Sequence, residues 1–357
     1  MTIRTAVKAL APYRFTPRSE PIKLDQNESP DDVPATLKER VMRALQDVAW
    51  NRYPGLGPTD LEARLAEHHG VATESVVVAN GSNTLIQALT IVSGIGRSVV
   101  TVAPTFAVYA SQARLLGAEL VEVPLGPRFA LPARELRDAL TNRSGVLFLA
   151  NPAAPTGNLF GEAEVEDLIG AAGEFLVVID EAYSEFAGRN LEALAARHEN
   201  VVLLRTFSKA FGLAGARVGY ALAHAGVAEE LRKALLPFSV SAWQTATAMA
   251  LLDEREVVAQ RVHHVLSERG RVWAALAAMP GVEPFPSEAN FILFRVTDPA
   301  AWYRSLLEAG VVIRRQDHLP GAEGCLRVSI GTVSENDAFL AACEAASSAA
   351  RSVAPPA

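Results

Sequence analysis

The chain has 357 residues, of which 50% are apolar and 20% are charged. A globular chain of this length and composition can bury two hydrophobic cores, so we expect a large domain and a smaller one. The formal charge is −7, and Lys and Arg never cluster beyond a pair, which argues against a nucleic-acid or membrane-surface partner. Small molecules are therefore the expected partners.

Neither secretion nor a membrane span is predicted. The stretch from Met1 to Leu10 lacks the apolar core of a signal peptide, and no segment approaches the roughly 18 uninterrupted apolar residues of a membrane helix. Cys325 and Cys343 are far apart and follow no metal-ligand spacing, so we expect reduced thiols and no bound metal. These features predict a cytoplasmic protein.

A proline-rich arm begins the chain, and short β-branched runs then alternate with amphipathic stretches typical of helices. Strands buried on both faces of a sheet have nearly continuous apolar sequences. Runs of this kind occupy residues 75–79, 98–103, 119–123, 145–150, 174–179, 200–205 and 217–221. The alternation predicts an α/β fold with a mostly parallel central sheet.

The last third of the chain has a different pattern. A long helical stretch at 241–278 is followed by strands at 290–295 and 325–330 and by helices at 300–309 and 334–349. We therefore predict three parts: an N-terminal arm (1–42) that joins the small domain, a large domain (43–238), and a small α+β C-terminal domain (239–357).

The first informative loop follows the strand at 75–79 and reads Asn80-Gly81-Ser82-Asn83-Thr84. A glycine turn there leads into a helix whose first turn carries hydroxyl and amide side chains. Free N–H groups and the helix dipole favour a phosphate at such a site. Taken alone, the pattern is more often an ordinary helix cap.

Two further loops follow strands of the same sheet. Asp180 comes directly after the strand at 174–179, with Tyr183 three residues on, and Lys209 lies between hydroxyl and glycine residues after the strand at 200–205. In isolation, an aspartate at this position caps a turn about as often as it belongs to a functional site, and a lysine is usually a solvated surface residue. Only their combination indicates a function.

Ligands of an open α/β sheet lie at the carboxyl ends of its strands, so the three loops are expected to meet. Together they offer a phosphate cradle, a carboxylate for a ring nitrogen and an amine for an aldehyde, which is how proteins hold pyridoxal 5′-phosphate. We predict that Lys209 bonds the aldehyde and that Asp180 keeps the ring nitrogen protonated. Arg217 is expected to bind the phosphate through its planar fork, beside Thr206 and Ser208.

The segments that contain these residues resemble a known family. Residues 151–157, 180–183 and 206–217 are similar to those of class II aminotransferases of PLP fold type I, and most closely to histidinol-phosphate aminotransferases. The likeness extends over nearly the whole chain, from Asn27-Glu28-Ser29-Pro30 to residues 326–331. It implies the PLP-dependent transferase fold, with a large domain around a mostly parallel sheet and a smaller α+β domain.

The resemblance also implies a homodimer with active sites at the interface. In such a dimer Tyr53 reaches the cofactor phosphate of the partner subunit and lies near the substrate. Tyr109 stacks on the pyridine ring, Tyr183 acts in catalysis by hydrogen-bonding the ring hydroxyl, and Asn27 lies where the substrate enters.

Two arginines near the C-terminus are implied to bind the anionic group of the substrate. Arg314 and Arg327 are thirteen residues apart, on what we predict are neighbouring strands. Two guanidinium forks suit a phosphate better than a single carboxylate needs. Arg315 is the competing candidate, but strand alternation directs it to the opposite face.

Three positions depart from the family pattern. Ala154 stands where many relatives have an asparagine that donates to the ring oxygen, and Asn151 alone remains nearby. Asn83-Thr84 replaces two carboxylates of the usual cradle, and Ser29 replaces an asparagine of the arm. The ring-oxygen hydrogen bond is therefore expected to be absent or to come from elsewhere.

The function implied is a transaminase that moves an amino group between histidinol phosphate and 2-oxoglutarate in histidine biosynthesis, with Lys209 as general acid and base. Two enzymatic alternatives stay open, and a third, non-enzymatic one is disfavoured. An aromatic amino acid aminotransferase would hold a carboxylate with the same arginines, and a decarboxylase of a phosphorylated amino acid shares the fold. A non-catalytic PLP-binding regulator would need an attached DNA-binding module, for which this chain has no room.

Overall fold

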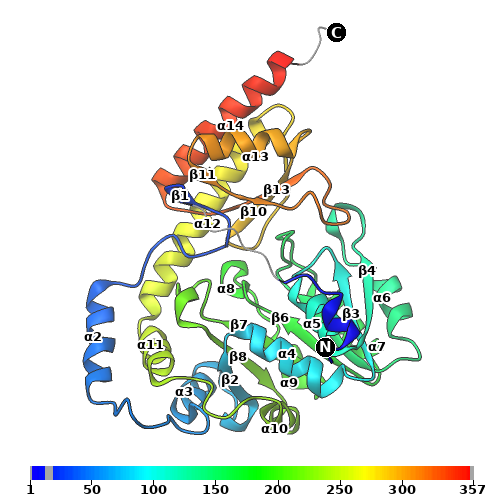
Figure 1. Cartoon of the computed structure of the whole chain (residues 1–357), viewed down its shortest axis with the longest axis vertical. Coiled ribbons are helices and arrows are strands. Elements are labelled where there is room, and N and C mark those ends of the chain that lie inside the picture. The colour runs from blue at the N-terminus through cyan, green and yellow to red at the C-terminus, as the bar shows by residue number, and fades with distance from the viewer. Residues whose placement is uncertain (1, 13–18, 354–357) are drawn as a thin grey trace.

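The computed structural model describes residues 2–12 and 19–353, and it has the predicted α/β architecture (Figure 1). The seven predicted strands of the large domain are present within two residues of their expected bounds. They are β2 (Val76–Asn80), β3 (Ser98–Ala103), β4 (Glu119–Pro124), β5 (Gly145–Ala150), β6 (Phe175–Asp180), β7 (Val201–Thr206) and β8 (Val218–Ala223). They form one sheet in the order β2-β8-β7-β6-β5-β3-β4.

The sheet is parallel except for β8, which is antiparallel to both of its neighbours. Alternate residues of each strand are buried on opposite faces: Val146 and Phe148 of β5 pack in one hydrophobic cluster, and Leu147 and Leu149 in another. This two-sided burial explains the continuous apolar runs. The helices that cover the two faces are α3 (Thr59–His69), α4 (Ser82–Ser93), α5 (Val108–Leu116), α6 (Ala133–Leu140), α7 (Glu162–Ala171), α9 (Glu192–Arg197) and α10 (Ala225–Lys233).

The small domain has its own sheet and its own core. Its antiparallel strands lie in the order β12 (Arg314–Arg315), β13 (Cys325–Ser329), β10 (Phe291–Arg295) and β9 (Glu283–Pro284). The helices α12 (Arg255–Ala278), α13 (Pro299–Glu308) and α14 (Val333–Val353) lie beside this sheet in the upper part of Figure 1. None of the helices in the described ranges is long and apolar enough to cross a membrane.

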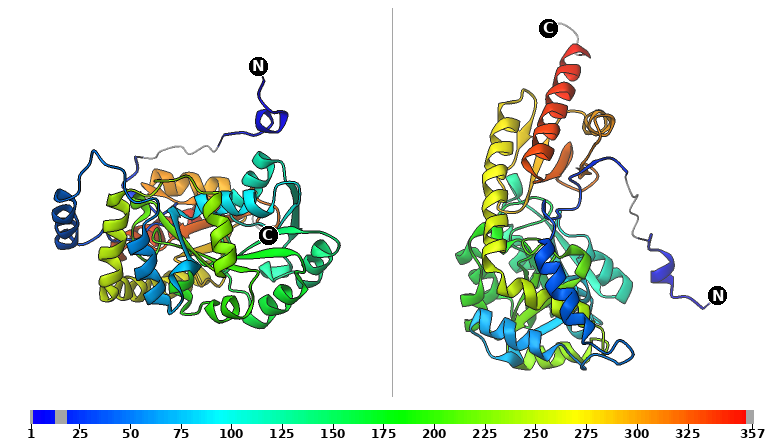
Figure 2. Two further views of the ribbon diagram at one scale, coloured as in Figure 1. Left: turned by 90° about the horizontal axis from the view of Figure 1, so that it is seen from below. Right: turned by 90° about the vertical axis from the view of Figure 1, so that its left-hand side faces the viewer.

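The N-terminal arm pairs with this small domain. Its strand β1 (Ile22–Lys23) runs parallel to β11 (Val311–Val312), while α1 (Thr5–Lys8) and α2 (Ala35–Gln46) lie before and after it. Figure 2 shows α2 at the margin of the molecule and the short α1 on another side. The arm therefore connects segments almost 290 residues apart in the chain, since Ile22 is the register partner of Val311.

The prediction of one long helix over 241–278 is wrong. The structure has two helices, α11 (Ala242–Asp253) and α12, with a break at Glu254. The break has a tertiary cause, because Ala248 and Leu251 of α11 join the core of the large domain, whereas Val265 of α12 joins that of the small domain. This packing favours a domain boundary at Glu254, and the predicted boundary after residue 238 stays a prediction.

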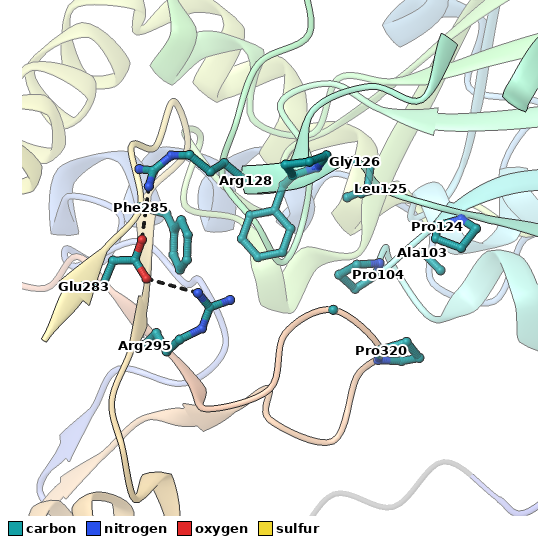
Figure 3. A pocket seen from close by; sticks show the side chains of 13 residues that line it. Ala103, Pro104, Pro124, Leu125, Gly126, Arg128, Glu283, Phe285, Arg295 and Pro320 are labelled. Carbon is teal, nitrogen blue, oxygen red and sulfur yellow. Dashed lines mark hydrogen bonds and ion pairs between the residues drawn. The ribbon is translucent and has the colours of Figure 1, made fainter. Parts of the chain in front are cut away.

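Glu283 and Phe285 form a contact between the two domains (Figure 3). Glu283 accepts from Arg128 of the large domain at 3.1 Å and from Arg295 of its own domain at 3.0 Å. Phe285 meets Phe129 edge to face, with 4.9 Å between ring centroids. These residues border a cavity of about 320 Å³ that Pro104 and Pro320 help to line.

We expect the buried ring, and not the ion pairs, to stabilise this contact. Phe285 is 3% exposed, so Phe285→Ala should lower the free energy of unfolding by about 3 kcal/mol through lost burial and a cavity. Glu283→Gln should cost less than about 1 kcal/mol because exposed ion pairs contribute little. Urea denaturation of both variants measures the difference. Equal losses would show that the ion pairs hold the domains together.

Candidate active site

The carboxyl ends of β2, β6 and β7 lie at one edge of the large sheet, and the loops that follow them border a cavity of about 870 Å³. Nine of the predicted site residues line it: Ser82, Asn83, Tyr109, Asp180, Tyr183, Thr206, Ser208, Lys209 and Arg217. The convergence expected from strand order is therefore present in the structure. Gly81, Asn27, Tyr53, Arg314 and Arg327 lie outside this lining.

The N-terminus of α4 forms one end of the cavity. The helix begins at Ser82, and Gly81 before it has φ of 76°, a left-handed conformation that glycine adopts without strain. A Cβ at Gly81 would lie 2.6 Å from Nη2 of Arg217. Arg217 Nη1 in turn donates to Ser208 Oγ at 3.4 Å. Helix N–H groups, a hydroxyl and a guanidinium thus face one small space, as a phosphate site requires.

Two residues that sequence reasoning missed support this phosphate cradle from behind. A Cβ on Gly219 of β8 would lie 2.3 Å from the backbone nitrogen of Ser82, so the cradle rests directly on the strand. Gln244 of α11 donates to the Arg217 carbonyl at 2.7 Å and to Asn80 Oδ1 at 3.2 Å. The one signal for Gln244 in the sequence is its capping box with Ser241, which indicates a helix start and not a site.

Asp180 is the last residue of β6, and each oxygen of its carboxyl group accepts one hydrogen bond. Oδ2 accepts from the Tyr109 hydroxyl at 2.7 Å, and Oδ1 accepts from the backbone N–H of Ala182 at 3.2 Å. Burial raises the pKa of the Asp180 carboxyl, while the Tyr109 hydrogen bond acts in the opposite direction. The carboxyl group is thus buried and held in position in the lining of the cavity, as a partner for a ring nitrogen must be.

Tyr109 does not lie where stacking on a cofactor ring would place it. Its side chain is 0% exposed and its ring already stacks on Phe148, with centroids 4.9 Å apart and planes 3° apart. Phe106 meets Tyr109 edge to face and lines the cavity with its ring 36% exposed. The geometry therefore favours Phe106 as the ring that packs on a bound heterocycle. The phenol of Tyr109 instead orients Asp180.

The amine of Lys209 reaches the arm. Nζ donates to the backbone carbonyls of Gln26 and Asn27, both at 3.0 Å. Burial, followed by the nearby charge of Arg327, lowers the pKa of Lys209 to about 7. A lysine in this state supplies a neutral amine at ordinary pH, which is the form that attacks an aldehyde or accepts a proton.

Asn27 is 2% exposed and all of its polar groups have partners inside the protein. Its backbone has φ of 54°, its N–H donates to Ser329 Oγ at 2.8 Å, and its Nδ2 donates to the Tyr183 hydroxyl at 2.9 Å. Asn290 Nδ2 donates to the backbone carbonyl of Asn27 at 3.1 Å. In this arrangement Asn27 orients Lys209 and Tyr183, which is a different role from the predicted contact with an entering substrate.

The side chain of Asn151 is not directed to the cavity. Its Oδ1 accepts from the backbone N–H of Phe160 at 2.8 Å, so the amide holds the loop that follows β5. Ala154 lines the cavity without a donor. Of the residues the sequence offered, Tyr183 therefore remains as the hydrogen-bond donor for a ring oxygen. Burial raises the pKa of its hydroxyl and keeps it protonated.

Arg314 and Arg327 are directly opposite each other on the antiparallel strands β12 and β13. Opposite residues in such a pair share one face of the sheet, so both guanidinium groups extend to the same side. Arg327 Nη2 donates to the carbonyl of Asp25 in the arm at 2.9 Å. Arg315 is bound to Asp317: its Nε donates to Oδ1 of Asp317 at 2.9 Å.

Tyr53 lies away from the cavity of its own chain. Its side chain is 82% exposed and its ring stacks on Phe238, with 4.8 Å between centroids. The prediction for Tyr53 concerned the cavity of a partner subunit. Its exposure leaves the ring accessible to a second copy.

The cavity fits pyridoxal 5′-phosphate on three observations. The cradle at Gly81 would be filled by a Cβ, the buried Asp180 carboxylate is directed to the same space, and Lys209 supplies an amine with a depressed pKa. Thr206, Ser208 and Arg217 would hold the phosphate, and Phe106 would pack on the ring. The residues present therefore suit this cofactor.

Comparisons with known proteins identify relatives over almost the full chain. Residues 19–342 match the family model described as aminotransferase class I and II. The chain is 43% identical to a histidinol-phosphate aminotransferase of Deinococcus radiodurans, with 95% of each protein covered. It is 40% identical to the enzyme of that name from Thermococcus kodakarensis, with 96% of this chain and 97% of the relative covered.

A solved structure gives the same match. The histidinol-phosphate aminotransferase from Sinorhizobium meliloti, determined in complex with pyridoxal-5′-phosphate, superimposes with a TM-score of 0.88 at 27% identity and covers 99% of this chain and 98% of that one. L-threonine-O-3-phosphate decarboxylase from Porphyromonas gingivalis, at 22% identity and a TM-score of 0.78, shares the fold.

We expect Gly219→Ala to weaken cofactor binding, because the added methyl group would displace the backbone at Ser82. A matched control is Gly170→Ala in α7, where a Cβ meets nothing within 4 Å. A displaced cradle loses part of its charge-assisted contacts, so the Kd for pyridoxal 5′-phosphate should rise by about tenfold or more. Fluorescence titration of the cofactor-free variants measures it. An unchanged Kd for Gly219→Ala would show that the cradle lies elsewhere.

Proposed function

We propose, for a chain that belongs to the class I and II aminotransferase family and uses pyridoxal 5′-phosphate, that its substrates are histidinol phosphate and 2-oxoglutarate. The observation that carries this proposal is the cross-strand pair of Arg314 and Arg327. Relatives that are 43% and 40% identical bear the name of this activity, which supports the same choice of amino donor.

The bound cofactor supplies an electron sink, which lets a proton leave the carbon that bears the amino group. Lys209 is the group in this chain that can carry that proton, because its amine lies in the cavity with a pKa of about 7. A pKa near the working pH is the best compromise between accepting and donating a proton. The carbonyls of Gln26 and Asn27 orient the amine while it does so.

Asp180 and Tyr183 prepare the site for this transfer. The Asp180 carboxylate, oriented by Tyr109, favours a protonated ring nitrogen through its negative charge. Tyr183 offers its hydroxyl from the loop that follows Asp180, where Asn27 fixes its direction. Both groups act by position and charge, so neither needs to change its protonation state during the reaction.

Charge geometry selects the substrate. A phosphate dianion can accept hydrogen bonds from two guanidinium forks at once, whereas one carboxylate is satisfied by a single fork. Arg314 and Arg327 share a face of the small-domain sheet. The alternative of an aromatic amino acid donor needs one of these arginines and leaves the other unused.

We further propose that the working unit is a homodimer located in the cytoplasm. Large apolar side chains are exposed in two segments of the large domain, namely Trp50 at 83%, Tyr53 at 82%, Leu56 at 76% and Leu236 at 78%. Exposed apolar groups at this density are typical of a surface covered by a partner. A second copy would bring Tyr53 to the neighbouring cavity, as the family resemblance implies.

The substrate proposal is tested by Arg314→Ala, with Arg315→Ala as the matched control. Losing one charge-assisted phosphate contact should reduce kcat/KM for histidinol phosphate by about 10- to 150-fold. Phenylalanine should be little affected, because its carboxylate can stay on Arg327, and Arg315→Ala should change neither donor. Steady-state rates with 2-oxoglutarate as acceptor measure this. A wild-type preference for phenylalanine, or equal losses for both donors, would establish the aromatic aminotransferase instead.

The role of Lys209 is tested by pH. Its pKa is lowered from 10.5 to about 7, and the neutral amine is the reactive form. Covalent capture of pyridoxal 5′-phosphate by cofactor-free protein should therefore accelerate up to about pH 7 and then level off. Borohydride trapping followed by peptide mapping measures both the rate and the labelled residue. The control is free lysine acetylated at its α-amine, whose ε-amine should react faster with rising pH well beyond pH 7. A label on another lysine of the protein would refute the assignment.

A further inference from the structure

An ion pair of the arm lies in the lining of the cavity, on the side formed by the arm and the small domain, which we call the substrate end. Lys23 and Glu28 both line the cavity that holds Lys209, and the Lys23 ammonium contacts Glu28 Oε2 directly. Lys23 Nζ also lies 3.4 Å from Oδ1 of Asp25, whose side chain is buried. Lys23 thus stands between a buried carboxylate and a solvent-exposed one.

The backbone places Lys23 next to the two arginines. Lys23 in β1 is the register partner of Val312, two residues before Arg314. Arg327 Nη2 donates to the carbonyl of Asp25, two residues after Lys23. Three cationic side chains therefore come from adjacent segments of the small domain and the arm. Lys23 is the one among them that lines the cavity itself.

The Lys23–Glu28 pair is suited to exchange partners. The side chains are 38% and 47% exposed, and ion pairs at such positions contribute at most about 1 kcal/mol because water competes for both charges. An incoming dianion can therefore replace Glu28 at little cost. Asp25 would remain as the counter-ion that keeps the ammonium near the cavity.

We propose that Lys23 is a specificity-determining residue that exchanges its ion pair with Glu28 for the phosphate of the amino donor. This inference rests on the proposed function, since it adds a third cation to Arg314 and Arg327 around the same anionic group. The exchange also explains how one site serves two substrates. A dicarboxylate acceptor carries less charge on each anionic group than a phosphate, so Lys23 can return to Glu28 when the acceptor binds.

The competing explanation is that the pair merely holds the arm in place. The two explanations predict different signs for two variants. If Lys23 binds the anion, Lys23→Met weakens phosphate binding, whereas Glu28→Gln strengthens it by freeing the ammonium. If the pair only holds the arm, both substitutions weaken binding together, because either one breaks the same contact.

The two explanations are separated by the equilibrium binding of inorganic phosphate. It is measured on the cofactor-loaded enzyme by calorimetry at low salt. The cofactor's own phosphate fills the cradle, so added phosphate reports on the substrate end. We expect the Kd to rise about 5- to 20-fold in Lys23→Met and to fall about 2- to 5-fold in Glu28→Gln. Lys23→Arg keeps the charge and should stay within about threefold of wild type. Lys38→Met, which removes an exposed lysine paired with Asp32 elsewhere on the arm, is the matched control and should change nothing.

Shifts in the same direction for Lys23→Met and Glu28→Gln, or an unchanged Kd in Lys23→Met, would overturn the inference. So would a wild-type enzyme that binds no phosphate at this end. The measurement needs no turnover, so it is independent of the donor assay. An enzyme that transaminates histidinol phosphate while Lys23→Met binds phosphate normally refutes the role of Lys23 and leaves the proposed function standing.

Discussion

The burial of ionisable side chains at one edge of the large sheet is the constraint on which the active site depends. In that environment an unpaired charge is expensive, so each buried ionisable group has a dedicated partner or a shifted pKa. Burial raises the pKa of the Asp180 carboxyl, and the hydrogen bonds from a phenol and a backbone N–H act in the opposite direction. Lys209 is instead driven toward its neutral form. The same desolvation thus acts on both groups that are proposed to hold the cofactor, the carboxyl of Asp180 and the amine of Lys209.

Behind this edge lies a second buried set of charges that secures the strands. Arg205 of β7 donates to Glu181 at 3.0 and 2.7 Å through two of its nitrogens, and Glu192 lies 3.0 Å from the same guanidinium. Glu181 directly follows Asp180, and Arg205 precedes Lys209 by four residues. Removing one partner of a buried pair leaves an uncompensated charge in the protein interior. The network therefore holds the loops after β6 and β7 at fixed positions relative to each other.

The sequence was sufficient to predict the sheet and the three loops, because these follow from apolar runs, which are local patterns. Neighbouring strands for Arg314 and Arg327 were also expected, but the choice of these two arginines came from the family resemblance, and their register comes from the structure. The sequence was insufficient where tertiary packing decides. Nothing local distinguishes Tyr109 from Phe106 as the ring that faces the cavity, since both follow the same strand. Gln244 was missed for a related reason. Its side chain bonds to Asn80 and Arg217, which are distant in the sequence, and its own segment indicates only the start of a helix.

The attachment of the arm by β1 and β11 has a consequence for the order in which the protein matures. During synthesis the large domain can complete its sheet once β8 has left the ribosome. The carbonyls that hold the Lys209 amine, however, belong to an arm whose Asn27 is anchored by Ser329. A nascent chain therefore carries the lysine for more than a hundred residues before its orientation is secured. A segment made early and a segment made late thus close the catalytic centre together.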